Sequence, residues 1–171
     1  MKKILLVLSI VMLATSAFSQ TINQTKIDEK SQMEVMTGIW SREGLKTSDL
    51  FNSYYDTEYS TYTPDASVLD NIKIALKGKQ VTTKIVMGSW CGDSQEQVPR
   101  FLKMLDMINF ADTSLTIICV DRAKKSLNGE TDALNIQLVP TFIIYTEGKE
   151  IGRIVETPKE TLEKDFLLII K

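Results

Sequence analysis

The chain of 171 residues contains no histidine and only two cysteines, Cys91 and Cys119. Structural zinc sites draw several ligands from Cys and His, so this composition excludes one. Catalytic Ser–His and Cys–His pairs are excluded as well, because both need an imidazole as the general base. Two cysteines also make a poor disulfide framework for a small secreted protein. We therefore expect at least one thiol to serve chemistry, and we expect no metal and no cofactor.

Neither sign of charge dominates, with 20 basic against 22 acidic side chains spread along the chain. Such a balance creates no strong field to attract nucleic acid or an anionic membrane surface. The longest apolar run, from Ile4 to Leu13, is too short to span a bilayer comfortably. We expect neither nucleic-acid binding nor stable membrane insertion.

The N-terminus has the order of a secretory signal peptide. The basic start Met1-Lys2-Lys3 precedes the apolar run, and small residues then lead to Ala17-Phe18-Ser19. We predict cleavage near Ser19–Gln20 and a periplasmic or secreted location. The predicted organisation is a signal peptide at 1–19, a helical N-terminal extension at 20–78 packed on the domain, and the main domain at 79–171.

The extension is predicted to be helical from about Asp28 to Gly78. Its aromatic side chains recur every three or four residues, which places them in one stripe on a helix. Three interpretations of this stripe are open. It packs on the core, it forms a peptide-binding wall near an active site, or it is the surface by which a chaperone-like protein holds other proteins. Its members are Phe51, Tyr54, Tyr55, Tyr59 and Tyr62.

From Val81 onward the pattern changes to alternating strands and helices. A β-branched run predicts a first strand, and a continuous apolar run predicts a second strand covered on both faces. A central sheet with helices on both faces follows. The predicted elements are a strand at Val81–Met87, a helix at 94–110, a strand at 115–120, a hairpin at 141–156 and a last helix after Pro158.

Cys91 lies where the first of these strands ends and a helix begins. Free backbone N–H groups and the positive end of the helix dipole favour negative charge on a sulfur there. Ser94, three residues on, is placed to donate its hydroxyl to that sulfur, whereas the charge of Asp93 opposes a thiolate. The pair Asp121-Arg122, after the second strand, supplies charge near this point, and we expect a surface ion pair there.

The stretch Trp90-Cys91-Gly92-Asp93-Ser94 resembles the thioredoxin family, whose signature is Trp-Cys-x-x-Cys at a strand-to-helix junction. The resemblance covers the chain from Val81 to Lys171. It implies an α/β fold, a thioredoxin-like three-layer α/β/α sandwich with a central mixed sheet, here preceded by the helical N-terminal extension. Three further matches in order are the helix-kinking Pro99, the cis-proline loop Val139-Pro140-Thr141, and Gly148 in the last hairpin.

The departure from the family is Ser94, which stands where the resolving cysteine would be. A hydroxyl cannot attack a mixed disulfide, so the resemblance implies monothiol exchange with Cys91 as nucleophile. The implied partners are client proteins with a disulfide or an oxidised cysteine, and an external thiol reductant. In this scheme Trp90 shields the sulfur, Ser94 hydrogen-bonds the thiolate, and Val139, Pro140 and Gly92 contact the client.

Two other functions remain open on the sequence. A redox-inert binding module would keep the peptide groove of the family without turnover, and Ser94 favours that alternative. Glutaredoxin-like proteins with a Cys-Gly-x-Ser site are a second comparison, but this chain lacks their Gly-Gly-x-Asp segment after the proline. Cys119 lies in an apolar strand, where a free cysteine behaves as a small buried hydrophobe.

Overall fold

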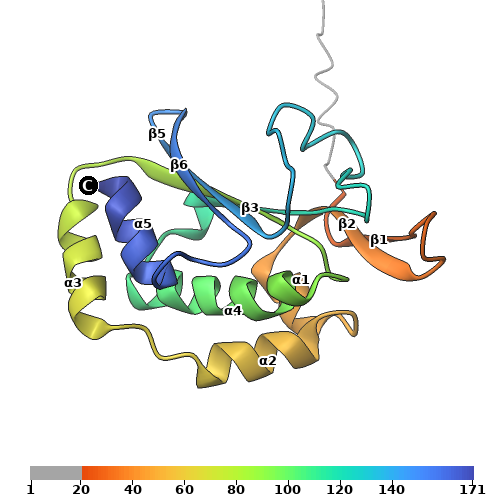
Figure 1. The fold of residues 1–171 in the computed structure, drawn as a ribbon, viewed down its shortest axis with the longest axis horizontal. Helices are drawn as coiled ribbons and strands as arrows, with labels where there is room; N and C mark the ends of the chain where they lie inside the picture. Colours follow the sequence, from red (N-terminus) through yellow and green to blue (C-terminus); the bar gives the residue numbers. More distant parts are fainter. Residues whose placement is uncertain (1–20) are drawn as a thin grey trace, which may run out of the picture.

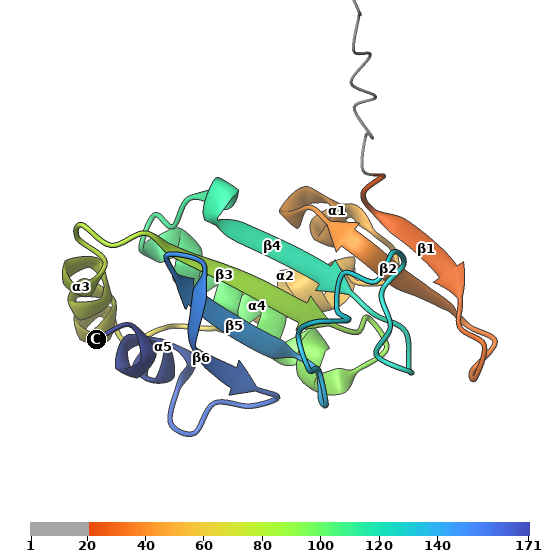
Figure 2. The same ribbon diagram turned by 90° about the horizontal axis from the view of Figure 1, so that it is seen from above.

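The computed structural model describes residues 21–171, so the predicted signal peptide and its cleavage site lie outside the described residues. Within that range the centre of the molecule is a six-stranded sheet in the order β1-β2-β4-β3-β5-β6 (Figures 1 and 2). Its strands are β1 (Gln24–Ile27), β2 (Glu34–Trp40), β3 (Val81–Met87), β4 (Leu115–Cys119), β5 (Thr141–Thr146) and β6 (Lys149–Val155).

The two central strands, β3 and β4, run parallel, and every other neighbouring pair in the sheet is antiparallel. The α/β class and the mixed sheet are therefore confirmed. Besides a 3₁₀ turn at Asp112–Ser114, the helices of the described chain are α1 (Arg42–Thr47), α2 (Asn52–Thr61), α3 (Ala66–Ala75), α4 (Gly92–Met107) and α5 (Leu162–Ile170).

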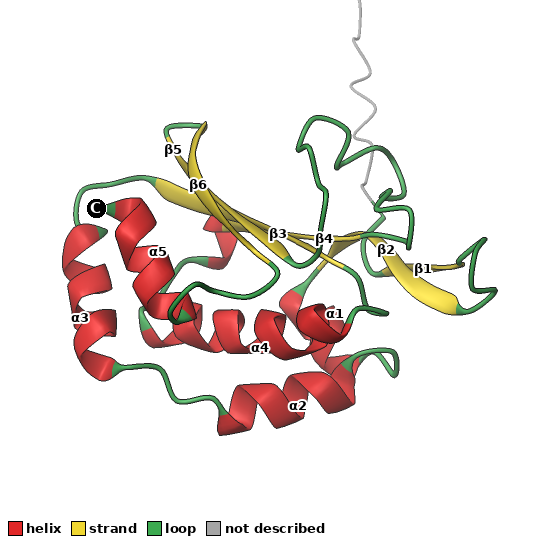
Figure 3. Ribbon diagram, in the orientation of Figure 1, coloured by secondary structure: helices red, strands yellow, loops and turns green. Residues whose placement is uncertain are grey.

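These helices pack on one face of the sheet. Buried side chains from α1 to α5 join Ile85 of β3 and Phe142 of β5 in one core cluster. Val86 and Ile143, their neighbours in the strands, point to the opposite face, as strand alternation requires. The loop between β4 and β5 lies against one end of that face, and no helix of the described residues covers it, in contrast to the second helical layer that was expected (Figure 3). Within the described residues, no helix is long and apolar enough to cross a membrane.

The prediction of a purely helical extension is wrong for the stretch that contains β1 and β2. The helices α1, α2 and α3 do follow, but β2 pairs antiparallel with β4 and places Gly38 opposite Cys119. Pairing with a strand so distant in the chain leaves no local periodic signal. Gly38 also hides the strand pattern, because it adopts φ +74° and an ideal Cβ there would lie 3.2 Å from Leu127 Cβ.

Asp28 ties the β1–β2 turn to the loop that follows β4. Its carboxylate accepts hydrogen bonds from the N–H groups of Lys30 and Ser31, from the Ser31 hydroxyl, and from the N–H of Arg122 at 3.1 Å. The bond from the Ser31 N–H is the largest cause that lowers the pKa of Asp28, which falls from 3.8 to about 2. Beside it, Lys26 Nζ lies 2.6 Å from Asp121 Oδ2.

We expect Asp28→Asn to lower the stability of the protein at neutral pH. A carboxyl whose pKa is lower in the folded chain stabilises it fully above its ordinary value of 3.8, and this contribution disappears as the pH falls toward about 2. The free energy of unfolding in urea, measured from pH 2 to pH 7, should therefore fall less steeply on acidification in the variant. Glu29→Gln removes a charge from the same turn and serves as the control. Equal acid sensitivity of Asp28→Asn and the parent would contradict this assignment.

Candidate functional site

Cys91 is the N-cap residue of α4, with φ −100° and ψ 123°, and its carbonyl accepts the first helical hydrogen bond from the Gln95 N–H. The side chain is half-buried, and its Sγ donates to the Val139 carbonyl oxygen at 3.1 Å. The Val139–Pro140 peptide bond is cis. The fold thus brings the predicted nucleophile and the predicted proline loop together from separate segments of the chain.

The proline loop is held rigidly on both sides. The Val139 side chain is only 2% exposed and belongs to the loop-side core cluster. The Pro140 carbonyl accepts from the Glu156 N–H at 2.7 Å, and the Thr141 hydroxyl donates to the Leu138 carbonyl at 2.7 Å. Within residues 21–171 the Val139 N–H has no hydrogen-bond partner, and in the folded chain it lies buried with the rest of the residue.

Ser94 has a different partner from the predicted one. The residue is fully buried, and its Oγ accepts a hydrogen bond of 3.2 Å from the Gly88 N–H at the end of β3. Among the described residues, no hydrogen bond joins its hydroxyl to the Cys91 sulfur. Gly92 is exposed, and an ideal Cβ there would meet no atom within 4 Å. The structure therefore gives Ser94 a role in the junction and leaves Gly92 at an open surface.

Trp90 packs against the backbone of the same junction. Its indole N–H donates to the Val120 carbonyl oxygen at 2.9 Å. An ideal Cβ on Gly88 would lie 2.6 Å from Trp90 Cε2, so the ring occupies the space that any side chain at Gly88 would need. The Arg122 guanidinium lies over the Trp90 ring, 5.0 Å from the ring centroid.

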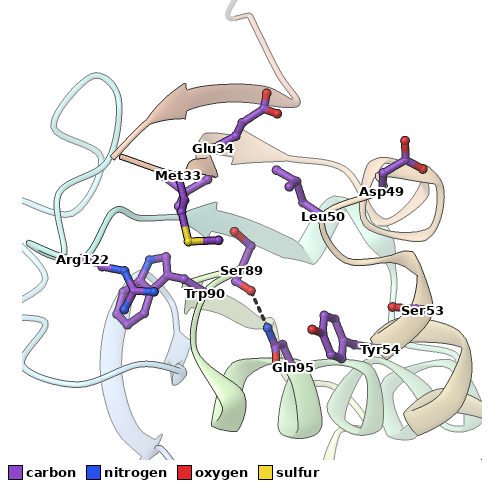
Figure 4. Close-up of a pocket in the computed structure, with 11 residues that line it drawn as sticks. Met33, Glu34, Asp49, Leu50, Ser53, Tyr54, Ser89, Trp90, Gln95 and Arg122 are labelled. Atoms are coloured by element: carbon purple, nitrogen blue, oxygen red, sulfur yellow. Dashed lines mark hydrogen bonds between the residues drawn. The ribbon is translucent and has the colours of Figure 1, made fainter. Parts of the chain in front are cut away.

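A pocket of about 360 Å³ opens beside Trp90 (Figure 4). The aromatic residues of the predicted stripe differ in burial. Phe51 and Tyr55 are buried in the core, whereas Tyr54 is 43% exposed and lines the pocket. Asp121 pairs with Lys26 of β1, which the sequence did not indicate, whereas Arg122 has no ion pair among the described residues and lines the pocket. The complete lining is Met33, Glu34, Val35, Asp49, Leu50, Ser53, Tyr54, Ser89, Trp90, Gln95 and Arg122.

Cys119 is fully buried in β4, which confirms the expectation of a small buried hydrophobe. Its side chain belongs to the helix-side core cluster, whereas Cys91 packs against the loop-side cluster. Burial raises the pKa of the Cys119 thiol, and both cysteines are free. Within the described part of the chain, no three Cys, Asp or Glu side chains are grouped as metal ligands would be.

Comparisons with known proteins assign the chain to a family. A family model described as thioredoxin matches residues 47–165, and the chain belongs to the thioredoxin family. Thioredoxin H2-1 of Oryza sativa subsp. japonica is 32% identical over 87 residues, 48% of this chain and 59% of that protein. Thioredoxin H2 of Arabidopsis thaliana is 34% identical over 76 residues, 44% of this chain and 53% of that protein.

The chain thus spans little more than half the length of these two relatives. Among solved structures, a mutant thioredoxin from Halobacterium salinarum is similar at 16% identity and a TM-score of 0.37, covering 58% of this chain and 79% of the other.

We expect Cys119 to affect stability and leave the site unchanged. Its thiol should react slowly with iodoacetamide in the folded protein and rapidly after unfolding in urea, because the folded sheet excludes the reagent. Cys119→Ala removes one buried sulfur, about one methylene's worth of packing, and should lower the free energy of unfolding by about 1 kcal/mol. Alkylation of Cys91 should be unchanged in this variant. Rapid labelling of Cys119 in the folded chain would contradict its burial.

We expect Gly88→Ala to displace the Trp90 indole. Overpacking of this kind costs about 1–3 kcal/mol of stability, and the indole N–H signal of Trp90 in a ¹H–¹⁵N spectrum should shift or broaden as its bond to Val120 is disturbed. Gly92→Ala is the matched control, because its new methyl group meets open space. If both variants left the indole signal in place, the close contact between Gly88 and Trp90 would be refuted.

Proposed function

We propose that this protein carries out monothiol thiol–disulfide exchange with client proteins through Cys91, outside the cytoplasm after removal of its signal peptide. The observation that carries the proposal is the position of the Cys91 sulfur. It lies at the N-terminus of α4, half-buried and 3.1 Å from the Val139 carbonyl. Unpaired N–H groups and the helix dipole at such a terminus stabilise a negatively charged nucleophile.

The proposed reaction is a balanced exchange of one disulfide bond for another. The Cys91 thiolate attacks one sulfur of a client disulfide, and a bond forms between the two sulfurs as the client's own S–S bond breaks. The second client sulfur leaves as a thiolate and takes a proton from solvent. With a client sulfenic acid, the same attack forms the mixed disulfide as the S–O bond breaks, and the hydroxide that leaves takes a proton from solvent to become water.

Release of the client requires a second thiol that the Trp-Cys-Gly-Asp-Ser motif does not contain. An external thiol, or a second thiol of the client, attacks the mixed disulfide and regenerates Cys91. Ser94 has no part in this step. It acts as a positioning residue, since its hydroxyl is the acceptor for the Gly88 N–H at the turn that presents the sulfur.

The backbone at Val139 supports binding of the client as an extended strand. An extended peptide pairs with free N–H and C=O groups of an exposed backbone segment. The Val139 N–H is unpaired within residues 21–171, but the residue is only 2% exposed and its carbonyl accepts from the Cys91 sulfur, so a client reaches this backbone by displacing the Cys91 side chain from it. A client that pairs with Val139 would bring its disulfide directly over Cys91, while the exposed Gly92 leaves room for it.

The alternative is a redox-inert module that binds peptides in the same groove. Ser94 favours this alternative, because its fully buried hydroxyl cannot resolve a mixed disulfide at Cys91 as a second thiol would. The two functions differ in one observable, the covalent bond at Cys91.

We expect Cys91 to form mixed disulfides with proteins of the cell envelope. The mature protein, incubated with an envelope extract and quenched with acid, should show adducts on Cys91 by mass spectrometry of non-reduced peptides. Cys91→Ser should form none, and Cys119→Ala should form as many as the parent. Binding of the same proteins without any Cys91 adduct would reject exchange in favour of the inert module.

Ser94→Cys should convert the site to a dithiol, since the family places its resolving thiol at that spacing. Insulin reduction with dithiothreitol should rise several-fold above the parent. The variant should also lose stability, because a thiol is a weaker acceptor for the buried Gly88 N–H.

N-terminal sequencing of the protein from cell fractions tests the proposed cleavage near Ser19–Gln20.

A further inference from the structure

Arg122 is the residue near Cys91 whose side chain is least accounted for. Its backbone N–H is fixed by Asp28, and its guanidinium lies 5.0 Å from the Trp90 ring centroid. Among the described residues, the side chain has no hydrogen bond and no ion pair, and its Nε is buried without an acceptor. Buried polar groups normally have a partner, and a guanidinium carries five donors in a fixed fork. The Arg122 guanidinium therefore has free hydrogen-bond donors beside Trp90, the residue next to Cys91.

The buried Nε is closed to a ligand, but the two terminal nitrogens of Arg122 are not buried, and the pocket beside Trp90 gives them a place for one. Arg122 and Trp90 form one end of it, and the hydroxyl-bearing Tyr54 lies across from them (Figure 4). The nearby acids do not neutralise the guanidinium. Glu34 accepts a hydrogen bond from Thr25 at 2.6 Å, and the carboxylates of Glu34 and Asp49 point away from the Trp90–Arg122 end.

Asp28 is also close, but its carboxylate already accepts four hydrogen bonds, including the one from the Arg122 backbone. A planar guanidinium matches a carboxylate in charge and in geometry. Stacking on an indole holds the fork in place, so little conformational freedom is lost when an anion binds.

We propose that Arg122, stacked on Trp90, forms a subsite for a carboxylate carried by the disulfide that Cys91 attacks. The substrate class is thus a disulfide with an acidic group near its sulfur. The carboxylate belongs either to a small thiol compound or to an acidic residue beside a client cysteine. This inference rests on the proposed exchange at Cys91. The subsite selects among substrates, and the bond-making step is the same for all of them.

The test compares disulfides that differ only in charge. The mature protein reacts with dithiodipropionate or with its neutral diamide, and mass spectrometry follows the growth of the Cys91 mixed disulfide. The rate ratio of acid to diamide should fall about fivefold in Arg122→Gln, the loss expected for a partly exposed charge pair. Lys125→Gln removes the same charge from an exposed position of the same loop and should leave the ratio unchanged. The diamide rate serves as the check that the variants remain folded.

A second arm separates the two sources of the carboxylate. Two cysteine peptides, joined to a coloured leaving thiol and carrying Glu or Gln beside the cysteine, replace the small disulfides. An Arg122-dependent preference for the Glu peptide assigns the subsite to clients, and a preference confined to dithiodipropionate assigns it to a small thiol compound. Reaction of every probe at Cys91 without any Arg122-dependent preference overturns the subsite alone. No reaction at Cys91 with any probe overturns the proposed exchange, and the subsite with it.

Discussion

The buried hydrogen bond from the Gly88 N–H to the Ser94 hydroxyl closes the junction between β3 and α4. It joins the residue after the strand to the first turn of the helix, and this closure puts Cys91 at the N-cap. Gly88 leaves room for the Trp90 ring, whose N–H reaches the Val120 carbonyl at the end of β4. One turn thus fixes the helix to both central parallel strands, and the sulfur position depends on it.

The two faces of the sheet contribute to two different clusters of buried side chains. Because strand side chains alternate between faces, Cys119 enters the helix-side core, while the loop-side cluster supports Val139 and Cys91. The helix-side core contains the large buried aromatics, such as the stacked Phe101 and Phe142 with ring centroids 4.3 Å apart. The loop side has the smaller cluster and an irregular covering. The two cysteines therefore lie with different core clusters, and both are free.

Patterns of neighbouring residues predicted the elements from β3 onward. They did not predict features that depend on contacts between distant segments of the chain. The bounds of β3 follow from its β-branched run, and the junction at Cys91 follows from the change of period after Met87. The strands β1 and β2 escaped prediction because β2 depends on β4 for its pairing. The partner of Ser94 escaped it for a similar reason. The spacing of three residues suggested a bond from Ser94 to the Cys91 sulfur, but the Ser94 oxygen accepts from the Gly88 N–H, which has no strand partner.

The unpredicted strands bear directly on the site. The N–H of Met36 in β2 donates to the Ser89 hydroxyl at 3.2 Å, so the strand holds the turn before Cys91 from outside the stretch that the family model matches. The turn before it supplies Met33 to the pocket and, through Asp28, the anchor for the Arg122 backbone. Cys91 and the proline loop lie within residues 47–165, whereas part of the pocket wall lies before residue 47. If exchange at Cys91 proceeds as proposed, the chemistry belongs to the family core, and the choice of substrate depends in part on two strands that precede it.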